Sequence, residues 1–215
     1  MPVFKMSENS KHLKVCLLPP IQEIFDAAKY LDLAISAHLK GDRISADELI
    51  RLADMQEIYD WSEALWGKGG PHSRPLPVEV PVPYFSPSER VEKRQAGEPV
   101  KRALITRDGF HCRFCGIPLI RGKIRNLIRG SYPDALRWDE SNLGNHAAFQ
   151  AMDLHYDHLL PHARGGTNEM SNMLVTCAPC NCGRDSLTLE EAGLSDPRLR
   201  ETIRSTWDGL ERFRP

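Results

Sequence analysis

Two Cys-x-x-Cys pairs constrain the fold of this chain more than any other feature. Cys112 and Cys115 form the first pair, and Cys177 and Cys180 form the second. Thiolates arranged in two such pairs are the usual ligands of a tetrahedral structural zinc ion. Because one ion needs all four sulfurs, the spacing predicts that segments far apart in the sequence meet at a single zinc site.

Polar residues between and beside these pairs predict a second site with different chemistry. Asp157 and Asn181 offer carboxylate and amide oxygens, which suit magnesium or manganese. His158 offers an imidazole that is neutral near pH 7 and can take a proton from water, and Asn172 adds another amide. A lone histidine would more often be a hydrogen-bonded core residue, but this set of neighbours favours catalysis. We therefore expect a structural ion and a catalytic ion.

Together these residues resemble the Cys-containing branch of the HNH endonucleases. The shared pattern is Cys-x-x-Cys, Asp-His, a proline, a Gly-Gly turn, an asparagine, and a second Cys-x-x-Cys followed by asparagine and a basic residue. Its members here are Cys112, Cys115, Asp157, His158, Pro161, Gly165, Gly166, Asn172, Cys177, Cys180, Asn181 and Arg184. The resemblance covers roughly residues 98–195. It implies an α+β fold, in which a ββα-metal module carries a zinc-binding double knuckle.

The resemblance also implies a role for each polar residue. His158 would be the general base that deprotonates water, while Asp157 and Asn181 would hold a catalytic Mg²⁺ or Mn²⁺ ion. Asn172 would fix the loop and orient the histidine. Arg184 stands where the family often has lysine, so a phosphate clamp is expected there. Asparagine at position 181 replaces the last histidine of the HNH name, as it does elsewhere in the Cys-containing branch.

Nucleic acid is the partner that this resemblance predicts, with DNA as the first candidate and RNA as an alternative. A basic run lies between the first cysteine pair and Asp157, where contact with phosphate and a simple solvated face are equally favoured readings. The predicted nucleic-acid contacts are Arg121, Lys123, Arg125, Arg129, His162, Arg164 and Arg184. A zinc-stabilised binding module without cleavage activity remains the alternative from a different functional class.

The chain divides into three parts in this interpretation. Residues 1–66 form an N-terminal helical arm or hairpin, residues 67–87 a proline-rich linker, and residues 88–215 the HNH domain with an insertion at 117–152. The linker holds six prolines, which favour an extended spacer and forbid a regular helix.

Hydrophobic periodicity predicts helices at 21–39 and 45–66, the second with Ser45 and Glu48 as a capping box. Their apolar stripe would pack on the nuclease domain or on a second copy of the chain, so a homodimer is one alternative. The other predicted elements are helices at 88–106, 145–152, 187–194 and 197–213, strands at 152–160 and 173–176, and a helix that starts at residue 178.

Composition places few further limits. Hydrophobic residues make up 41% of the chain and charged residues 27%, as in ordinary globular proteins, and the net charge of −1 favours no particular partner. The sequence predicts neither a membrane span nor a signal peptide. Using four of six cysteines for metal is typical of a reducing compartment, so we expect a cytoplasmic protein.

Overall fold

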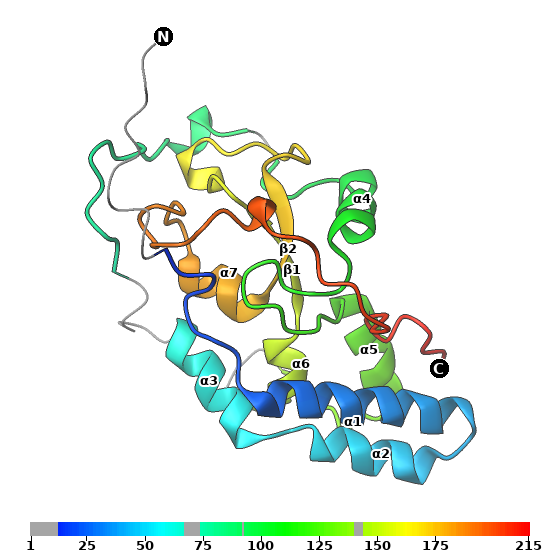
Figure 1. The fold of residues 1–215 in the computed structure, drawn as a ribbon. Helices are drawn as coiled ribbons and strands as arrows, with labels where there is room; N and C mark the ends of the chain where they lie inside the picture. The colour runs from blue at the N-terminus through cyan, green and yellow to red at the C-terminus, as the bar shows by residue number, and fades with distance from the viewer. Residues whose placement is uncertain (1–12, 67–73, 92, 140–143) are drawn as a thin grey trace.

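The computed structural model describes residues 13–66, 74–91, 93–139 and 144–215. Helices surround a small antiparallel sheet of two strands, so the chain has a mixed, α+β-like architecture (Figure 1). The first twelve residues of the predicted arm, residues 67–73 of the linker and residues 140–143 of the insertion lie outside the described residues. Within the described ranges, no helix combines the length and the apolar character that crossing a bilayer requires.

The strands and the helix that follows them form the centre of the structure. The strands are β1 (Leu154–His158) and β2 (Met173–Cys177), and the helix is α7 (Ala178–Arg184). The register pairs Leu154 with Cys177 and His158 with Met173, so β1 ends where β2 begins. All five residues of β2 are buried, because α7 packs against both strands and α4 packs against β2. The order strand, strand, helix agrees with the sequence-based prediction.

Within residues 13–66 the N-terminal part forms three helices, where the sequence predicted two. They are α1 (Gln22–Leu39), α2 (Arg43–Leu52) and α3 (Gln56–Trp66). The single helix predicted at 45–66 is therefore wrong, because the chain turns after Ala53. Asp54 lies in this turn, and its carboxylate accepts from the backbone N–H of Ala147 (2.7 Å) and from Arg137 (2.8 Å). The predicted cap is also wrong, since Asp42 precedes α2 and accepts from the N–H of Ser45 at 3.1 Å.

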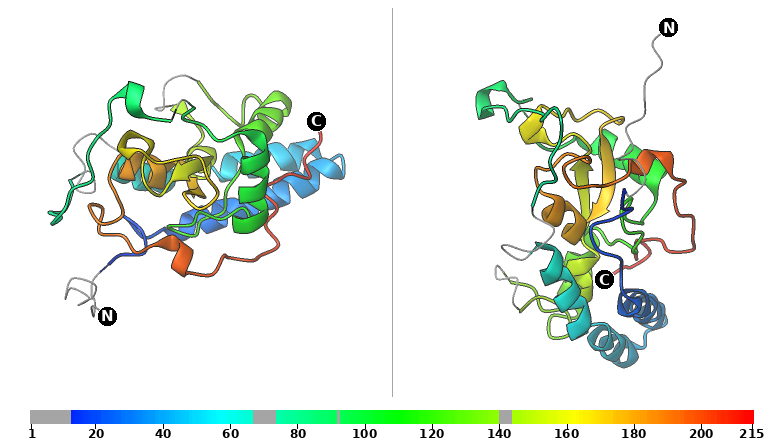
Figure 2. Two further views of the ribbon diagram at one scale, coloured as in Figure 1. Left: turned by 90° about the horizontal axis from the view of Figure 1, so that it is seen from above. Right: turned by 60° about the vertical axis from the view of Figure 1, so that its left-hand side comes forward.

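The apolar stripe of these helices packs on the rest of the chain. Helices α1 and α2 lie side by side below the sheet, and α3 contacts both α6 and α7 (Figures 1 and 2). One hydrophobic cluster runs from Cys16 through Ile24 and Trp61 to Phe213. Trp61 donates from its indole N–H to the carbonyl of Pro19 at 2.8 Å, as a core tryptophan does. The homodimer remains a prediction.

The segments around the sheet differ from the predicted helices in several places. Helix α4 (Glu98–Asp108) starts ten residues later than predicted, and a short 3-10 turn at Pro87–Glu89 precedes it in the chain. Helix α6 (Ala147–Ala151) occurs as expected, whereas α5 (Gly122–Ser131) was not anticipated.

The two closing helices predicted at 187–194 and 197–213 are absent from this described part of the chain, which holds turns and a 3-10 turn at Pro197–Leu199. Arginine side chains bind the backbone there instead. Arg113 donates to the carbonyls of Pro197, Arg200 (2.7 Å) and Glu201 (3.1 Å), oxygens that a helix would have used internally.

The described part of the proline-rich region, together with the residues up to α4, is a segment attached to the site. We call residues 74–91 and 93–97 the connecting segment. Its Leu76 N–H donates to Glu191 O at 2.7 Å, and its Phe85 N–H donates to Ala163 O at 2.9 Å. It follows the surface of the loops after β1 and α7, so it does more than space two parts of the chain.

Gly166 provides a test of how tightly the loop after β1 is folded. A Cβ atom there would lie 1.8 Å from the carbonyl oxygen of Leu160, so Gly166→Ala must displace backbone. We expect a loss of about 2–4 kcal/mol in the free energy of unfolding. Urea denaturation followed by circular dichroism would measure it.

Gly130→Ala is the matched control, because nothing lies within 4 Å of a Cβ at this position in α5. It should leave stability unchanged or raise it by about 0.5–1 kcal/mol. Equal stability of the two variants would contradict the packed loop.

Candidate functional site

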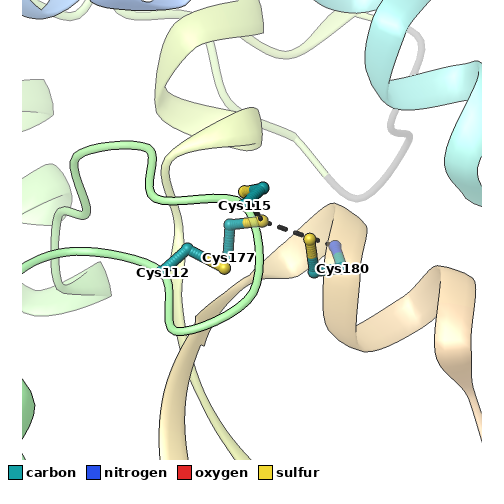
Figure 3. Close-up of side chains that lie close together, drawn as sticks. All are labelled: Cys112, Cys115, Cys177 and Cys180. Atoms are coloured by element: carbon teal, nitrogen blue, oxygen red, sulfur yellow. Dashed lines mark hydrogen bonds between the residues drawn. The ribbon is translucent and has the colours of Figure 1, made fainter. Parts of the chain in front are cut away.

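The four cysteines of the two pairs form one cluster. Cys112 and Cys115 come from the loop between α4 and α5, Cys177 ends β2, and Cys180 lies in the first turn of α7 (Figure 3). Their sulfur atoms all lie within 4.8 Å of one another, and those of Cys115 and Cys177 are 3.7 Å apart. A tetrahedral ion with metal–sulfur bonds of about 2.3 Å needs sulfurs about 3.8 Å apart. The cluster therefore fits a metal ion.

The burial of these sulfurs also favours a cation at their centre. Burial raises the pKa of the Cys177 thiol well above its ordinary value, and the neighbouring Cys112 and Cys115 raise it further. Several thiolates in so small a buried volume repel one another unless a positive ion compensates them.

The two remaining cysteines lie outside this group of four. Burial, followed by the nearby Cys115 and Cys112, raises the pKa of Cys16 to about 11, so it stays a neutral thiol. Cys182 is exposed.

His158, at the end of β1, is held by a chain of two hydrogen bonds. Its Nε2 lies 2.8 Å from Asn168 Oδ1, and Asn168 Nδ2 donates to the carbonyl of Lys93 at 2.6 Å. The carbonyl of Lys93 can only accept a hydrogen bond, so the Asn168 atom that faces it must be the NH₂ nitrogen. The Oδ1 atom of Asn168 therefore faces the histidine. Nε2 must then carry the proton, and Nδ1 is the acceptor of the neutral ring. Burial lowers the pKa of His158, which favours this neutral form at pH 7.

Asp157 has a partner that the sequence-based interpretation assigned elsewhere. Both of its carboxylate oxygens accept from Nη2 of Arg184 at 2.8 Å, and the same nitrogen donates to His158 O at 2.6 Å. Arg184 is only 1% exposed, and its Nη1 donates to Leu187 O at 2.6 Å. In this structure Arg184 therefore orients Asp157 and does not reach an external phosphate, contrary to the predicted clamp.

A cleft of about 220 Å³ is lined by three of the four residues predicted for the catalytic site, Asn172 being the exception. Asp157, His158, Asn181 and His162 all line it, and the ring centroids of His158 and His162 lie 5.8 Å apart. Asn181 donates from Nδ2 to Nδ1 of His155 at 2.8 Å, which turns its Oδ1 away from that ring. An amide oxygen, a carboxylate and an imidazole are thus collected on one surface from β1 and α7.

Asn172 binds the loop backbone and not the histidine. Its Oδ1 accepts from the N–H of Leu160 at 2.8 Å, and its Nδ2 donates to the carbonyl of Thr167 at 2.9 Å. It therefore closes the loop, as predicted, whereas the histidine is oriented by Asn168. The sequence held a weak signal for Asn168, which follows the Gly-Gly-Thr turn, but two asparagines so close together could not be told apart without coordinates.

Most of the predicted nucleic-acid contacts are occupied by acidic partners. Arg121 pairs with Glu211, which also lies 3.7 Å from Lys123. The other contacts are Arg125 with Asp153 (2.9 Å), Arg125 over the ring of Trp138 (3.7 Å), and the buried Arg164 with Glu191 (2.8 Å). Arg129 is exposed on α5. The basic run is therefore largely balanced within the protein.

Three residues that sequence reasoning missed line the same cleft: Arg90, Arg94 and Gln95. All belong to the connecting segment. The density of prolines indicated a spacer, and nothing in the local pattern indicated which surface that spacer would follow.

Replacing one cluster sulfur tests the metal centre. Purified wild-type chain should hold about one metal ion at the four-cysteine cluster. Cys177→Ser should lose most of it and melt at a markedly lower temperature, because the ion links the loop to β2 and α7. Elemental analysis and thermal denaturation would measure both effects.

Cys182→Ser, outside the cluster, is the matched control and should retain metal and stability. A metal-free wild-type chain prepared under reducing conditions would contradict the centre, as would full retention of metal by Cys177→Ser.

The site is thus a buried four-sulfur cluster and a polar cleft lined by two imidazoles, two carboxylates and the amides of Asn181 and Gln95. Comparison of the chain with protein-family models, with curated proteins and with solved structures gives no match in any of the three. What this site can do must therefore be inferred from its own residues and their contacts.

Proposed function

We propose that this chain is a metal-dependent endonuclease that hydrolyses phosphodiester bonds in DNA. The observation that carries the proposal is the convergence of His158, Asp157 and Asn181 on one cleft. Phosphodiester hydrolysis needs a base for the attacking water, neutralisation of the phosphoryl oxygens and stabilisation of the departing oxygen. The cleft offers a residue for each requirement.

His158 acts as the general base in this proposal. With its Nε2–H donated to Asn168, the ring has Nδ1 as its proton acceptor. A lowered pKa keeps that atom unprotonated at neutral pH, and the hydrogen bond from Nε2 stabilises the imidazolium that forms when the proton arrives. Asn168 is accordingly a positioning residue for the base.

Asp157 and Asn181 are the ligands proposed for a magnesium or manganese ion. Such an ion would neutralise charge on the phosphoryl and leaving oxygens. Oδ1 of Asp157 accepts from Arg184 and from the backbone N–H of His158, whereas Oδ2 accepts, among the described residues, from Arg184 alone and keeps a second lone pair that can bind the ion. Oδ1 of Asn181 is the corresponding amide oxygen.

Zinc is the metal proposed for the four-cysteine cluster. Four thiolates in tetrahedral reach are typical of closed structural zinc sites, which have no open position for a substrate. The ion would hold the loop at Cys112–Cys115 against the junction of β2 and α7, and so fix Asn181, one residue after Cys180.

One observation favours the alternative of a nucleic-acid-binding module without cleavage. Arg184 already neutralises Asp157, and this lowers the electrostatic demand for a second cation. That module would bind DNA or RNA without cutting either. An RNA-directed nuclease differs from the main proposal only in its substrate.

Removing the imidazole tests the base. His158→Ala should reduce nicking of supercoiled plasmid by at least about 100-fold in Mg²⁺ or Mn²⁺, because general base catalysis contributes factors of this size. Gel electrophoresis of the plasmid, with a chelator control and a parallel RNA digestion, would measure it.

The metal content and melting temperature of His158→Ala should match the wild type. Wild-type chain that binds nucleic acid but never cuts it would decide for the binding module, and full activity of His158→Ala would remove His158 from the mechanism.

Changing Asn168 tests the orientation of the base. Asn168→Ala should lower kcat about 10- to 100-fold because the ring of His158 loses its partner, and it should also raise KM because Asn168 holds the backbone of Lys93, next to Arg94 in the cleft. Asn168→Asp would place a carboxylate beside the ring and raise the pKa of His158, so the acid limb of the pH–rate profile should move to higher pH.

Asn126→Ala, at an exposed position on α5, is the matched control and should have no effect on either parameter. If Asn168→Asp leaves the pH profile unchanged, the proposed contact does not act on the base.

A further inference from the structure

We propose that Arg94 of the connecting segment, with Arg90 beside it, is the phosphate-binding contact of the cleft. The inference rests on the proposed function, because it assigns the substrate's phosphate backbone to a surface of the same cleft. It concerns two residues outside the Asp157–Arg184 region that the sequence pattern marked as the site.

Binding of a phosphate backbone in the cleft needs a cationic side chain, and the two buried arginines near the cleft do not supply one. Arg184 is buried against Asp157, and Arg164 is buried against Glu191 and stacked at 3.8 Å on the ring of Tyr84. The charged or titratable groups that line the cleft are the acids Asp157 and Asp185, the imidazoles of His158 and His162, the phenol of Tyr156, and the guanidinium groups of Arg90 and Arg94. A polyanionic backbone approaching this surface would meet the two arginines as its permanent positive charges.

Arg94 is the more available of the two. It is exposed, and within the described ranges neither a hydrogen bond nor an ion pair engages its guanidinium group. Arg90 is half-buried and donates from Nε to the carbonyl of Phe85 at 2.9 Å, which fixes its side chain against the segment. A free guanidinium group can bind two oxygens of one phosphate at once.

Hydrogen bonds from the loop between β1 and β2 hold the connecting segment at the cleft. His162 donates from Nε2 to Val91 O at 2.9 Å, and Asn168 donates to Lys93 O at 2.6 Å. The residue directly before Arg94 is thus joined through Asn168 to the imidazole of His158. The contacts that position His158 therefore also position Arg94, so the base and the cation keep a fixed position relative to each other.

Binding of DNA by the full-length chain tests this assignment without requiring cleavage. Anisotropy of a fluorescein-labelled duplex would be measured with His158→Ala as the background, at several salt concentrations. Adding Arg94→Ala should weaken binding about three- to tenfold and lower the slope of log Kd against log salt by about one, as loss of one phosphate contact does. Arg94→Lys, which keeps the charge, should recover most of the affinity.

Arg74→Ala is the matched control, because Arg74 is an exposed arginine of the same segment that does not line the cleft. It should bind like the background. Melting temperatures of all variants would exclude unfolding as the cause of any loss.

The outcomes separate the two proposals. If wild type nicks plasmid but Arg94→Ala binds with unchanged affinity and salt slope, the Arg94 assignment is overturned and the nuclease stands. If wild type never nicks plasmid but Arg94→Ala weakens binding as described, the Arg94 contact stands and the nuclease falls. Equal losses in Arg94→Ala and Arg74→Ala would indicate general charge attraction and overturn the specific contact.

Discussion

The convergence of four sulfur atoms is the constraint on which the rest of the structure depends. A two-stranded sheet is marginal by itself in water, and the helix that follows it has only seven residues. The cluster joins the loop after α4 to the end of β2 and the start of α7, so three short elements become one unit. Helices α3 and α6 then cover α7, and α4 supports β2, which places the strand end and the cleft on a rigid base.

The Asp157–Arg184 pair adds a second constraint with both structural and chemical consequences. Breaking a buried ion pair by removing one partner typically costs about 3–5 kcal/mol, because the other charge is left uncompensated. Loss of Asp157 would therefore disturb folding as well as any ion it binds. This coupling is why His158, whose ring is hydrogen-bonded among the described residues to the Asn168 amide alone, offers the cleaner separation of chemistry from stability.

The sequence was most informative where a chemical requirement fixed residue type and spacing together. The cysteine cluster followed from thiolate spacing, whereas the strand–strand–helix order was what the resemblance to a ββα-metal module implied. The misses have a different origin. The closing helix predicted at 197–213 was wrong because Arg113, more than eighty residues away, takes the carbonyls of Pro197, Arg200 and Glu201. The role given to Asn172 went to Asn168 because loop geometry, and not residue type, decides which amide reaches the ring.

The hydrogen bonds that attach the connecting segment restrict the sequence of the loop more than the sequence of the segment. Val91 and Lys93 accept their hydrogen bonds through backbone carbonyls, which every amino acid possesses. His162 and Asn168 contribute side chains to the same bonds and cannot be exchanged freely. The path of the segment over the cleft is therefore encoded in the loop that receives it, so a natural or engineered replacement of the segment can carry different side chains to the rim without redesign of the centre.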